Sequence, residues 1–323
     1  MRNFKFLLNS LCGMTIILGL VACADSSSLP QDEQARVSSG RVLYASATAA
    51  PGGDGSRSAP FNSLEALERA SSAGDDLVIL ASPLDVAALD GGIALKPHQR
   101  LIGDGPNVLQ FENNAPVKGA SALSELPRIR NTNISHLNGD AVRLSEANEV
   151  RNIVINESIR GAIYGLNSPN TVIQGNDISG FNTICTIGFT VQPFVLPTVL
   201  PFIGAPILLP AGWAGIMVDA NSGAGKINII DNYVHNSACG NGIDIRISGN
   251  ADYIAEVSGN NVQELEFGPL HQAGVHLVHA ISLQVRNSGK LTANSKNNSQ
   301  SYIGAEGADC EGLFMNLSEN GNA

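Results

Sequence analysis

Positive charge is scarce in this chain of 323 residues. Lys and Arg number 19 against 29 Asp and Glu, which gives a formal net charge of −10. An acidic surface argues against binding to nucleic acid and against a broad basic platform for anionic lipid. It still leaves room for an acidic polysaccharide, because such a ligand needs only a local basic groove. We therefore expect no nucleic-acid partner.

The amino terminus lacks an apolar run long enough to span a bilayer. Arg2 and Lys5 precede a largely apolar stretch over residues 6–22, which Asn9 and Ser10 interrupt. A charged start, a short apolar core and small residues at its end are typical of a signal peptide. A permanent membrane span would require a longer uninterrupted run.

The residues LVAC, which end at Cys23, resemble the lipobox of bacterial lipoproteins. That resemblance implies a signal peptide over residues 1–22, lipidation of Cys23 and attachment to a membrane through its acyl chains. An ordinary secretory signal is the alternative. Ala24 and Asp25 favour the outer membrane within that family, so the expected location is the bacterial cell envelope, periplasmic or surface-exposed. Residues 23–40 are rich in Ser, Gln and Asp and should form a flexible tether.

The rest of the chain repeats a short pattern. A glycine opens a run of alternating apolar residues, and an asparagine-rich run follows about ten residues later. The opening glycines are Gly139, Gly161, Gly215, Gly242, Gly274 and Gly312. Short strands at a recurring period predict stacked repeats, none of which can bury its apolar face alone. Antiparallel hairpins would typically contain Asn-Gly turns between closely spaced strands, and the chain has few such turns.

The spacing of the glycines fits one coil of stacked strands per repeat. Gly139 and Gly161 are 22 residues apart, and Gly161 and Gly215 are 24 apart once residues 184–213 are set aside as an insertion. The next two spacings are 27 and 32 residues. In the asparagine-rich runs, an axial column should contain Glu157, Asn176, Asn232 and Asn260. Stacked asparagines can hydrogen-bond along the axis and satisfy the backbone of the turns.

Three segments of the sequence carry a resemblance to a known fold family. Residues 58–67 (SAPFNSLEAL), 74–80 (GDDLVIL) and 92–105 (GIALKPHQRLIGDG) resemble the N-terminal opening and first coil of right-handed parallel β-helix proteins of the pectate-lyase-like superfamily. This implies an all-β, right-handed parallel β-helix over residues 41–323, closed at its start by a short capping helix. Asn62 can cap that helix. The superfamily hosts lyases, hydrolases, epimerases and non-catalytic surface proteins, so the fold leaves the activity open.

Cysteine is scarce as well, and three cysteines remain after residues 1–23. Cys185 and Cys239 follow runs placed on neighbouring coils, where equivalent sites lie about 4.8 Å apart. That spacing suits a disulfide, and an exported protein meets an oxidising compartment. We predict a Cys185–Cys239 disulfide and leave Cys310 free.

The insertion at 184–213 contains no charged residue. Its prolines at 193, 197, 201, 206 and 210 exclude a membrane-spanning helix. Either it folds over the flank of the stacked coils and buries its own apolar residues, or it presents an apolar patch to a partner or a bilayer surface. A cover over a substrate is the third alternative.

Candidate chemistry follows from the alternation of one strand. If Ile243, Ile245 and Ile247 point inward, Asp244 and Arg246 point to solvent. Counting from each opening glycine places Met217, Asp244, His276 and Phe314 in one outward column, and Asp219, Arg246, Val278 and Asn316 in the next. Asp219 should then adjoin Arg246, and Asp244 should adjoin His276. This patch is where Asp, Arg and His converge.

The candidate patch supports two classes of function. A lyase for acidic polysaccharide needs a base and a neutralising cation or metal, for which Arg246 or His276 could be the base and Asp219 with Asp244 weak Ca²⁺ ligands. A glycoside hydrolase needs two carboxylates, which Asp219 and Asp244 could supply. The candidate patch lacks the adjacent aspartates of the superfamily's hydrolases, and the chain lacks their Gly-His-Gly segment and the dense acidic cluster of the superfamily's calcium lyases.

The preferred interpretation is a surface-anchored lipoprotein whose sheet face binds a glycan or a protein partner without catalysis. In that case the charged residues of the patch are cross-strand pairs on a solvated face. A polysaccharide lyase or glycoside hydrolase is the alternative. We assign no metal site.

Overall fold

The computed structural model describes residues 40–105, 108–112, 115–117, 124–191, 209–266, 278–303 and 311–318. The expected signal peptide, Cys23 and nearly all of the expected tether lie outside the described residues, as do His276 and Cys310. Residues 38–323 form one compact unit. No helix in the described part is both long and apolar enough to cross a bilayer.

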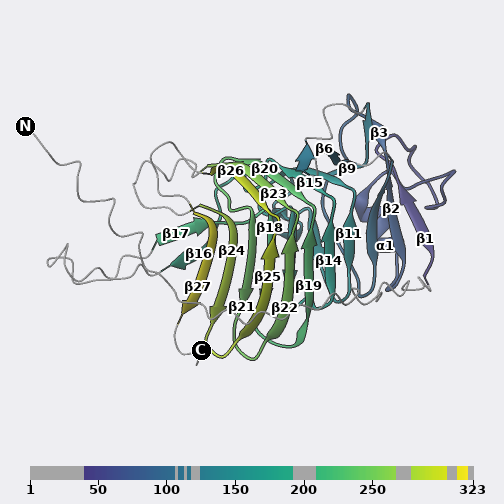
Figure 1. Cartoon of the computed structure of the whole chain (residues 1–323). Coiled ribbons are helices and arrows are strands. Elements are labelled where there is room, and N and C mark those ends of the chain that lie inside the picture. Colours follow the sequence, from purple (N-terminus) through teal and green to yellow (C-terminus); the bar gives the residue numbers. More distant parts are fainter. Residues whose placement is uncertain are drawn as a thin grey trace, which may run out of the picture. The chain divides into compact units, whose positions relative to one another are not determined.

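The fold is all-β, and its three large sheets are parallel throughout (Figure 1). The eight-stranded sheet contains, in spatial order, β1 (Val42–Ala45), β2 (Asp76–Leu80), β5 (Arg100–Asp104), β11 (Glu149–Arg151), β14 (Thr171–Gln174), β19 (Ala224–Ile230), β22 (Asp252–Ser258) and β25 (Lys290–Lys296). The seven-stranded sheet contains β27 (Glu311–Ser318), β24 (His279–Arg286), β21 (Ile243–Ile247), β18 (Ile216–Ala220), β13 (Ile163–Leu166), β10 (Val142–Leu144) and β4 (Ile93–Ala94). The six-stranded sheet contains β26 (Ser299–Ile303), β23 (Asn261–Leu265), β20 (Tyr233–Ser237), β15 (Asp177–Ser179), β12 (Val154–Ser158) and β9 (Arg128–Asn131).

From β10 onward the chain visits these sheets in a fixed order: seven-stranded, eight-stranded, six-stranded. We call one such pass a coil. Each strand therefore pairs with its counterparts one coil earlier and one coil later, as β18 does with β13 and β21. The spacing of the opening glycines predicts this parallel stacking.

Aliphatic side chains from all three large sheets form one continuous core. Ile243, Ile245 and Ile247 are fully buried in it, as the alternation predicts. The core extends from Leu43 in β1 to Leu283 in β24. Leu313 and Met315 of β27 pair in register with buried residues of β24, yet they are 44% and 65% exposed.

The short helix α1 (Leu64–Ala70) packs against the first strands of the core. Leu64 and Leu67 are fully buried in the core cluster. Ser63, rather than the expected Asn62, is the N-cap: its side chain accepts a hydrogen bond from the backbone N–H of Ala66. A serine in extended conformation at this position satisfies one of the free N–H groups of the first turn.

Smaller elements lie outside the large sheets. They are three antiparallel pairs, β3 (Ser82–Pro83) with β8 (Glu125–Leu126), β6 (Gln110–Glu112) with β7 (Ala115–Val117) and β16 (Ile187–Val191) with β17 (Leu209–Gly212), and a 3-10 turn at Leu137–Gly139. The β16–β17 pair opens and closes the apolar insertion; residues 192–208 between its strands lie outside the described residues. Ile184 and Ile187 at its start are 58% and 50% exposed, whereas Ala211 and Trp213 at its end are buried.

A buried ladder of asparagine side chains runs across four coils just before the strands of the six-stranded sheet. The side-chain amides of Asn176, Asn232 and Asn260 each donate to the side-chain oxygen of the next asparagine at 3.0 Å, and the last acceptor is Asn298. The expected member Glu157 is wrong, because Ile155 pairs with Ile178 and so places Ile153 at this position. Each amide also donates to a backbone carbonyl of the preceding coil, which satisfies polar groups that no water reaches.

We expect Asn232→Ala to lower the free energy of unfolding by about 3 kcal/mol, because it orphans buried donors and acceptors on both neighbouring coils. Asn232 is fully buried, and it donates to Ile173, Ile230 and Asn260. Urea unfolding followed by circular dichroism measures the change. The matched control is Asn294→Ala, at an exposed residue whose side chain donates to Glu256, with an expected effect of about 0.5 kcal/mol or less. Equal losses in the two variants would contradict the ladder's role.

Candidate functional site

The outward side of the seven-stranded sheet brings the predicted aspartates and arginine together. Asp219 of β18 pairs in register with Arg246 of β21, and Met217 pairs with Asp244. These are the neighbours that counting from Gly215 and Gly242 predicts.

The predicted neighbour of Asp244 in the following coil is wrong. Asp244 pairs with Ser282, and Arg246 pairs with Gln284 rather than Val278. The cause is a longer connection: β24 begins at His279, five residues beyond Gly274, so the count from that glycine fails. His276 itself lies outside the described residues.

Asp244 is fully buried instead of facing solvent. The Asn241 amide donates to both of its carboxylate oxygens, at 3.2 and 3.3 Å. Burial raises the pKa of Asp244 to about 7, and the nearby Asp219 charge raises it further, while Arg246, Asn241 and Ser282 oppose the shift. A carboxyl of this kind exchanges its proton near neutral pH.

Arg246 is held on three sides. Its guanidinium forms an ion pair with Asp219, donates to the carbonyl oxygen of Gly188 at 2.6 Å and contacts the Met217 sulfur. Burial raises the pKa of Asp219, and the charge of Arg246 and its hydrogen bond oppose that rise. The side chains of Arg246 and Asp219 keep 15% and 25% of their surface exposed, so the pair lies at the edge of solvent.

Two aromatic residues that the pattern analysis missed lie beside this pair. Tyr164 of β13 precedes Met217 in the same column, and Trp213 follows β17. Their rings meet edge to face, with centroids 5.3 Å apart. Burial raises the pKa of Tyr164, as does the charge of Asp219, while three arginines oppose the shift. The hydroxyl group therefore stays protonated at neutral pH, and it has no hydrogen-bond partner among the described residues.

Two further arginines surround these rings. The guanidinium carbons of Arg143 and Arg160 both lie 5.3 Å from the Tyr164 ring centroid, and that of Arg160 lies 4.0 Å from the Trp213 ring. Arg246 is 5.9 Å from the same Trp213 ring. Cation–π contacts therefore connect all three guanidinium groups to one aromatic pair.

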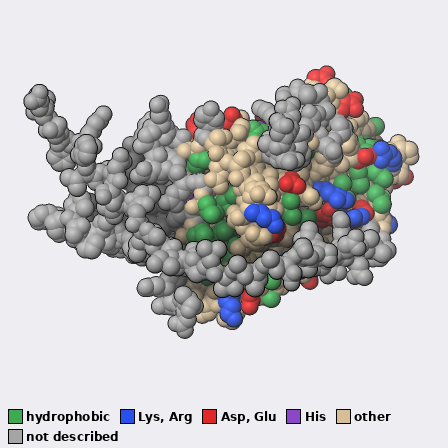
Figure 2. Space-filling model, viewed as in Figure 1, with side chains coloured by type: hydrophobic (Ala, Val, Ile, Leu, Met, Phe, Trp, Pro, Cys, Tyr) green, Lys and Arg blue, Asp and Glu red, His purple; other side chains and the backbone are tan. Residues whose placement is uncertain are grey.

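Asp140 holds both Arg143 and Arg160 in place. It is fully buried, and it accepts two hydrogen bonds from Arg160 and one from Arg143, at 2.6–2.8 Å. Other arginines nearby in the sequence are also paired with carboxylates: Arg130 with Asp90, and Arg151 with Glu149. On the face drawn in Figure 2, basic and acidic side chains also lie close to one another.

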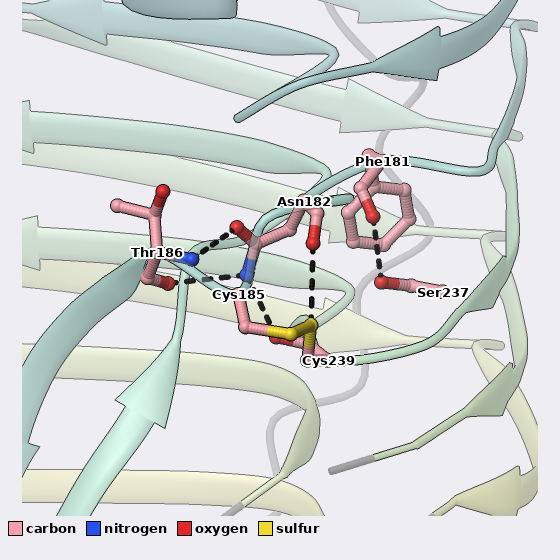
Figure 3. The surroundings of a disulfide bond; sticks show 6 residues. All are labelled: Phe181, Asn182, Cys185, Thr186, Ser237 and Cys239. Carbon is pink, nitrogen blue, oxygen red and sulfur yellow. Dashed lines mark hydrogen bonds between the residues drawn. A yellow bond between two sulfur atoms is a disulfide. The ribbon is translucent and has the colours of Figure 1, made fainter. Parts of the chain in front are cut away.

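The Cys185–Cys239 disulfide lies at the base of the β16–β17 pair. It joins the turns of adjacent coils, with the two Cα atoms 5.3 Å apart, between the cysteines expected from the sequence. Figure 3 shows Asn182 beside it, donating to the carbonyl oxygens of Thr186 and Cys239 at 3.1 and 2.7 Å. Gly188, which holds Arg246, lies three residues beyond Cys185.

We name the set of Arg143, Arg160, Tyr164, Trp213, Asp219 and Arg246 the arginine–aromatic face. Its accessible groups are cationic or hydrogen-bond donors, apart from the carboxylate of Asp219, which is paired. Such a face can hold an anionic group by charge-assisted hydrogen bonds. Within the described residues, no three His, Cys, Asp or Glu side chains are grouped so as to hold a metal ion.

No protein-family model matches the chain, and no curated protein is similar to it. Among solved structures, an alginate lyase from Paenibacillus sp. str. FPU-7 is similar at 13% identity, over 88% of this chain and 99% of that one, with a TM-score of 0.20. A similarity at that TM-score supports no argument about this chain. The chemistry of the site has to be judged from its own residues.

The pKa of Asp244 makes stability depend on pH in a defined direction. Below pH about 4 the carboxyl is protonated in both folded and unfolded chains and contributes nothing. Above the unfolded value of 3.8 only the unfolded chain releases the proton, so folding loses stability as the pH rises toward about 7.

We therefore expect Asp244→Asn to match the wild type at pH 4 and to be more stable at pH 8, measured as the shift in thermal midpoint. Exposed Asp252→Asn is the control, for which no such pH-dependent gain is expected. An Asp244→Asn variant that is less stable than the wild type at pH 8 would refute the raised pKa of Asp244.

Proposed function

We propose that the chain is a right-handed parallel β-helix lipoprotein of the bacterial outer membrane, anchored through Cys23. Its arginine–aromatic face binds an acidic polysaccharide without cleaving it. The fixed order in which the chain visits three parallel sheets, together with the closing helix α1, supports the fold assignment. The location and the anchor rest on the lipobox resemblance alone.

The convergence of three arginines on the Tyr164–Trp213 pair carries the binding proposal. The protein has a net charge of −10, whereas on this outward sheet face three arginines stand against two paired carboxylates, Asp140 and Asp219. Guanidinium groups match the planar carboxylate of a uronate, and Arg143 retains 29% of its side-chain surface. The Tyr164 hydroxyl group can donate a hydrogen bond to the same ligand.

A carboxylated glycan fits this face better than a protein partner does. The exposed parts are small and polar, and they lie on successive coils along the stacking axis, whereas a stable protein interface needs a large patch with an apolar centre. A polymer can contact successive coils with only a few groups on each. This favours a chain of uronate residues running across β10, β13, β18 and β21.

The burial, pairing and raised pKa of the candidate groups favour binding without cleavage. A lyase requires a base close to the substrate. Tyr164 has a raised pKa, Asp219 is paired with Arg246, and Asp244 is buried. Calcium held by Asp219 and Asp244 stays a prediction; it would have to displace Arg246 from one carboxylate and reach the other in the interior.

Polygalacturonate should change the tryptophan fluorescence, because Trp213 is the single tryptophan of the chain and lies against Arg160. Neutral dextran should leave it unchanged. We expect the affinity measured by calorimetry to fall with added salt, and to fall at least about tenfold in Arg246→Ala, since a charge-assisted hydrogen bond is worth about 1.5–3 kcal/mol. Arg151→Ala, on the eight-stranded sheet, is the matched control and should bind as the wild type does. Equal binding of dextran would refute the proposal.

One observation favours an enzyme as the second candidate. Asp244 has a pKa of about 7, which suits a general acid or base at neutral pH, and Arg246 lies next to it. If ligand binding exposed Asp244, a polysaccharide lyase or a glycoside hydrolase would become the better assignment.

We expect no turnover of uronate polymers by the wild type. Ultraviolet absorbance detects unsaturated ends, and a reducing-sugar assay detects hydrolysis. Asp244→Asn and Arg246→Ala are assayed in parallel. Product formed by the wild type and abolished in Asp244→Asn would replace binding with catalysis as the function.

A further inference from the structure

We propose that the Cys185–Cys239 disulfide is a clasp that positions Arg246, so that reduction of this bond weakens ligand binding at the arginine–aromatic face. The effect on binding rests on the proposed function, which supplies the ligand. The positioning of Arg246 by the disulfide can be tested without any ligand.

The position of the β16–β17 pair depends on its base, the two points at which the chain enters and leaves the pair. These two strands form a sheet of their own and belong to none of the three large sheets. Their placement over the seven-stranded sheet is therefore set where the chain enters and leaves the pair, at Cys185–Thr186 and at Trp213. The two points are tied directly, because the backbone N–H of Trp213 donates to the carbonyl oxygen of Thr186 at 2.8 Å.

The disulfide fixes the entry point to the next coil. Cys239 lies between β20 and β21 and is 4% exposed, so it belongs to the rigid interior. Asn182 reinforces the same turn: its side-chain oxygen accepts from the Thr186 backbone at 2.7 Å, and its amide donates to the Cys239 carbonyl oxygen. The sulfur–sulfur bond is the covalent part of this tie.

The entry point in turn positions the binding face. Three residues after Cys185, the carbonyl oxygen of Gly188 accepts from Arg246 at 2.6 Å. On the exit side, the Trp213 ring lies beside Arg246 and Arg160. A displacement of the hairpin base therefore removes one hydrogen bond from Arg246 and shifts the ring that both arginines contact.

Packing at Gly188 provides a way to displace the hairpin without touching the disulfide. A Cβ atom at Gly188 would lie 2.7 Å from the backbone oxygen of Gly212, which is too close. Gly188→Ala should therefore push β16 away from β17 while both cysteines remain joined. It serves as the second variant if loss of the disulfide prevents folding.

The experiment compares the wild type with and without a phosphine reductant, the double variant Cys185→Ser/Cys239→Ser, and Gly188→Ala. Circular dichroism first establishes that each is folded. Hydrogen exchange of the Trp213 amide and the rate of phenylglyoxal modification of Arg246 report the clasp without ligand. Modification of Arg100, which pairs with Asp76 far from the disulfide in the sequence, is the internal control. Calorimetry with polygalacturonate reports binding.

We expect reduction to speed both exchange at Trp213 and modification of Arg246, and to weaken binding about tenfold, as loss of one charge-assisted hydrogen bond would. The double variant should match the reduced wild type and should not respond to reductant. Unchanged exchange and unchanged Arg246 modification after reduction overturn the clasp. Faster modification with unaltered affinity overturns the claim that reduction weakens binding. Absence of polygalacturonate binding by the oxidised wild type overturns the proposed function instead, while exchange and modification still decide whether the disulfide positions Arg246.

Discussion

Hydrogen bonding between successive coils is the constraint on which the rest of this structure depends. A single coil leaves its backbone groups and its aliphatic side chains exposed, and only a neighbour in parallel register satisfies both. The buried ladder from Asn176 to Asn298 extends that register into the turns, where the strand ladder has ended. The turns stack as regularly as the strands do, and this regular stacking is why the asparagine side chains can be buried in the interior.

Because the inward side chains form the core and the backbone joins the coils, the outward positions of the strands are available for binding or catalysis. Inward residues such as Ile243 and Ile245 belong to the core, whereas the intervening positions form columns along the stacking axis. On the seven-stranded sheet these columns gather arginines, aromatic rings and carboxylates. Asp244 occupies an outward position in this alternation, yet it is fully buried and hydrogen-bonded to Asn241 and Ser282. An outward position is thus not necessarily a solvated one.

The parallel coils and the Asp219–Arg246 pair could be predicted because each depends on offsets within short, regular strands. The placements of His276 and Glu157 failed because they depend on connections whose lengths vary from coil to coil. Tyr164 was missed for a related reason. It follows its opening glycine by three residues, whereas Met217 follows by two. Alignment on the buried aliphatic residues, instead of on glycine, would have placed both in one column.

Other features left no signal in the sequence. Trp213 ends an apolar insertion, and nothing in that segment indicates that the ring contacts Arg160, which lies 53 positions earlier. The role of Asp140 as the shared partner of two arginines likewise requires the three-dimensional arrangement. Cation–π contacts and bidentate ion pairs depend on side-chain direction, which a periodic pattern does not specify.

The columns on the seven-stranded sheet have one further consequence. Successive coils are separated by about 4.8 Å along the axis, and each presents a different side chain that is at least partly exposed: Leu166, then Asp219, then Arg246. A linear molecule laid along such a column meets a graded series of chemical environments at even intervals. The face can therefore distinguish one polymer from another by the order of their substituents. A single monomer contacts too few coils to be distinguished in this way.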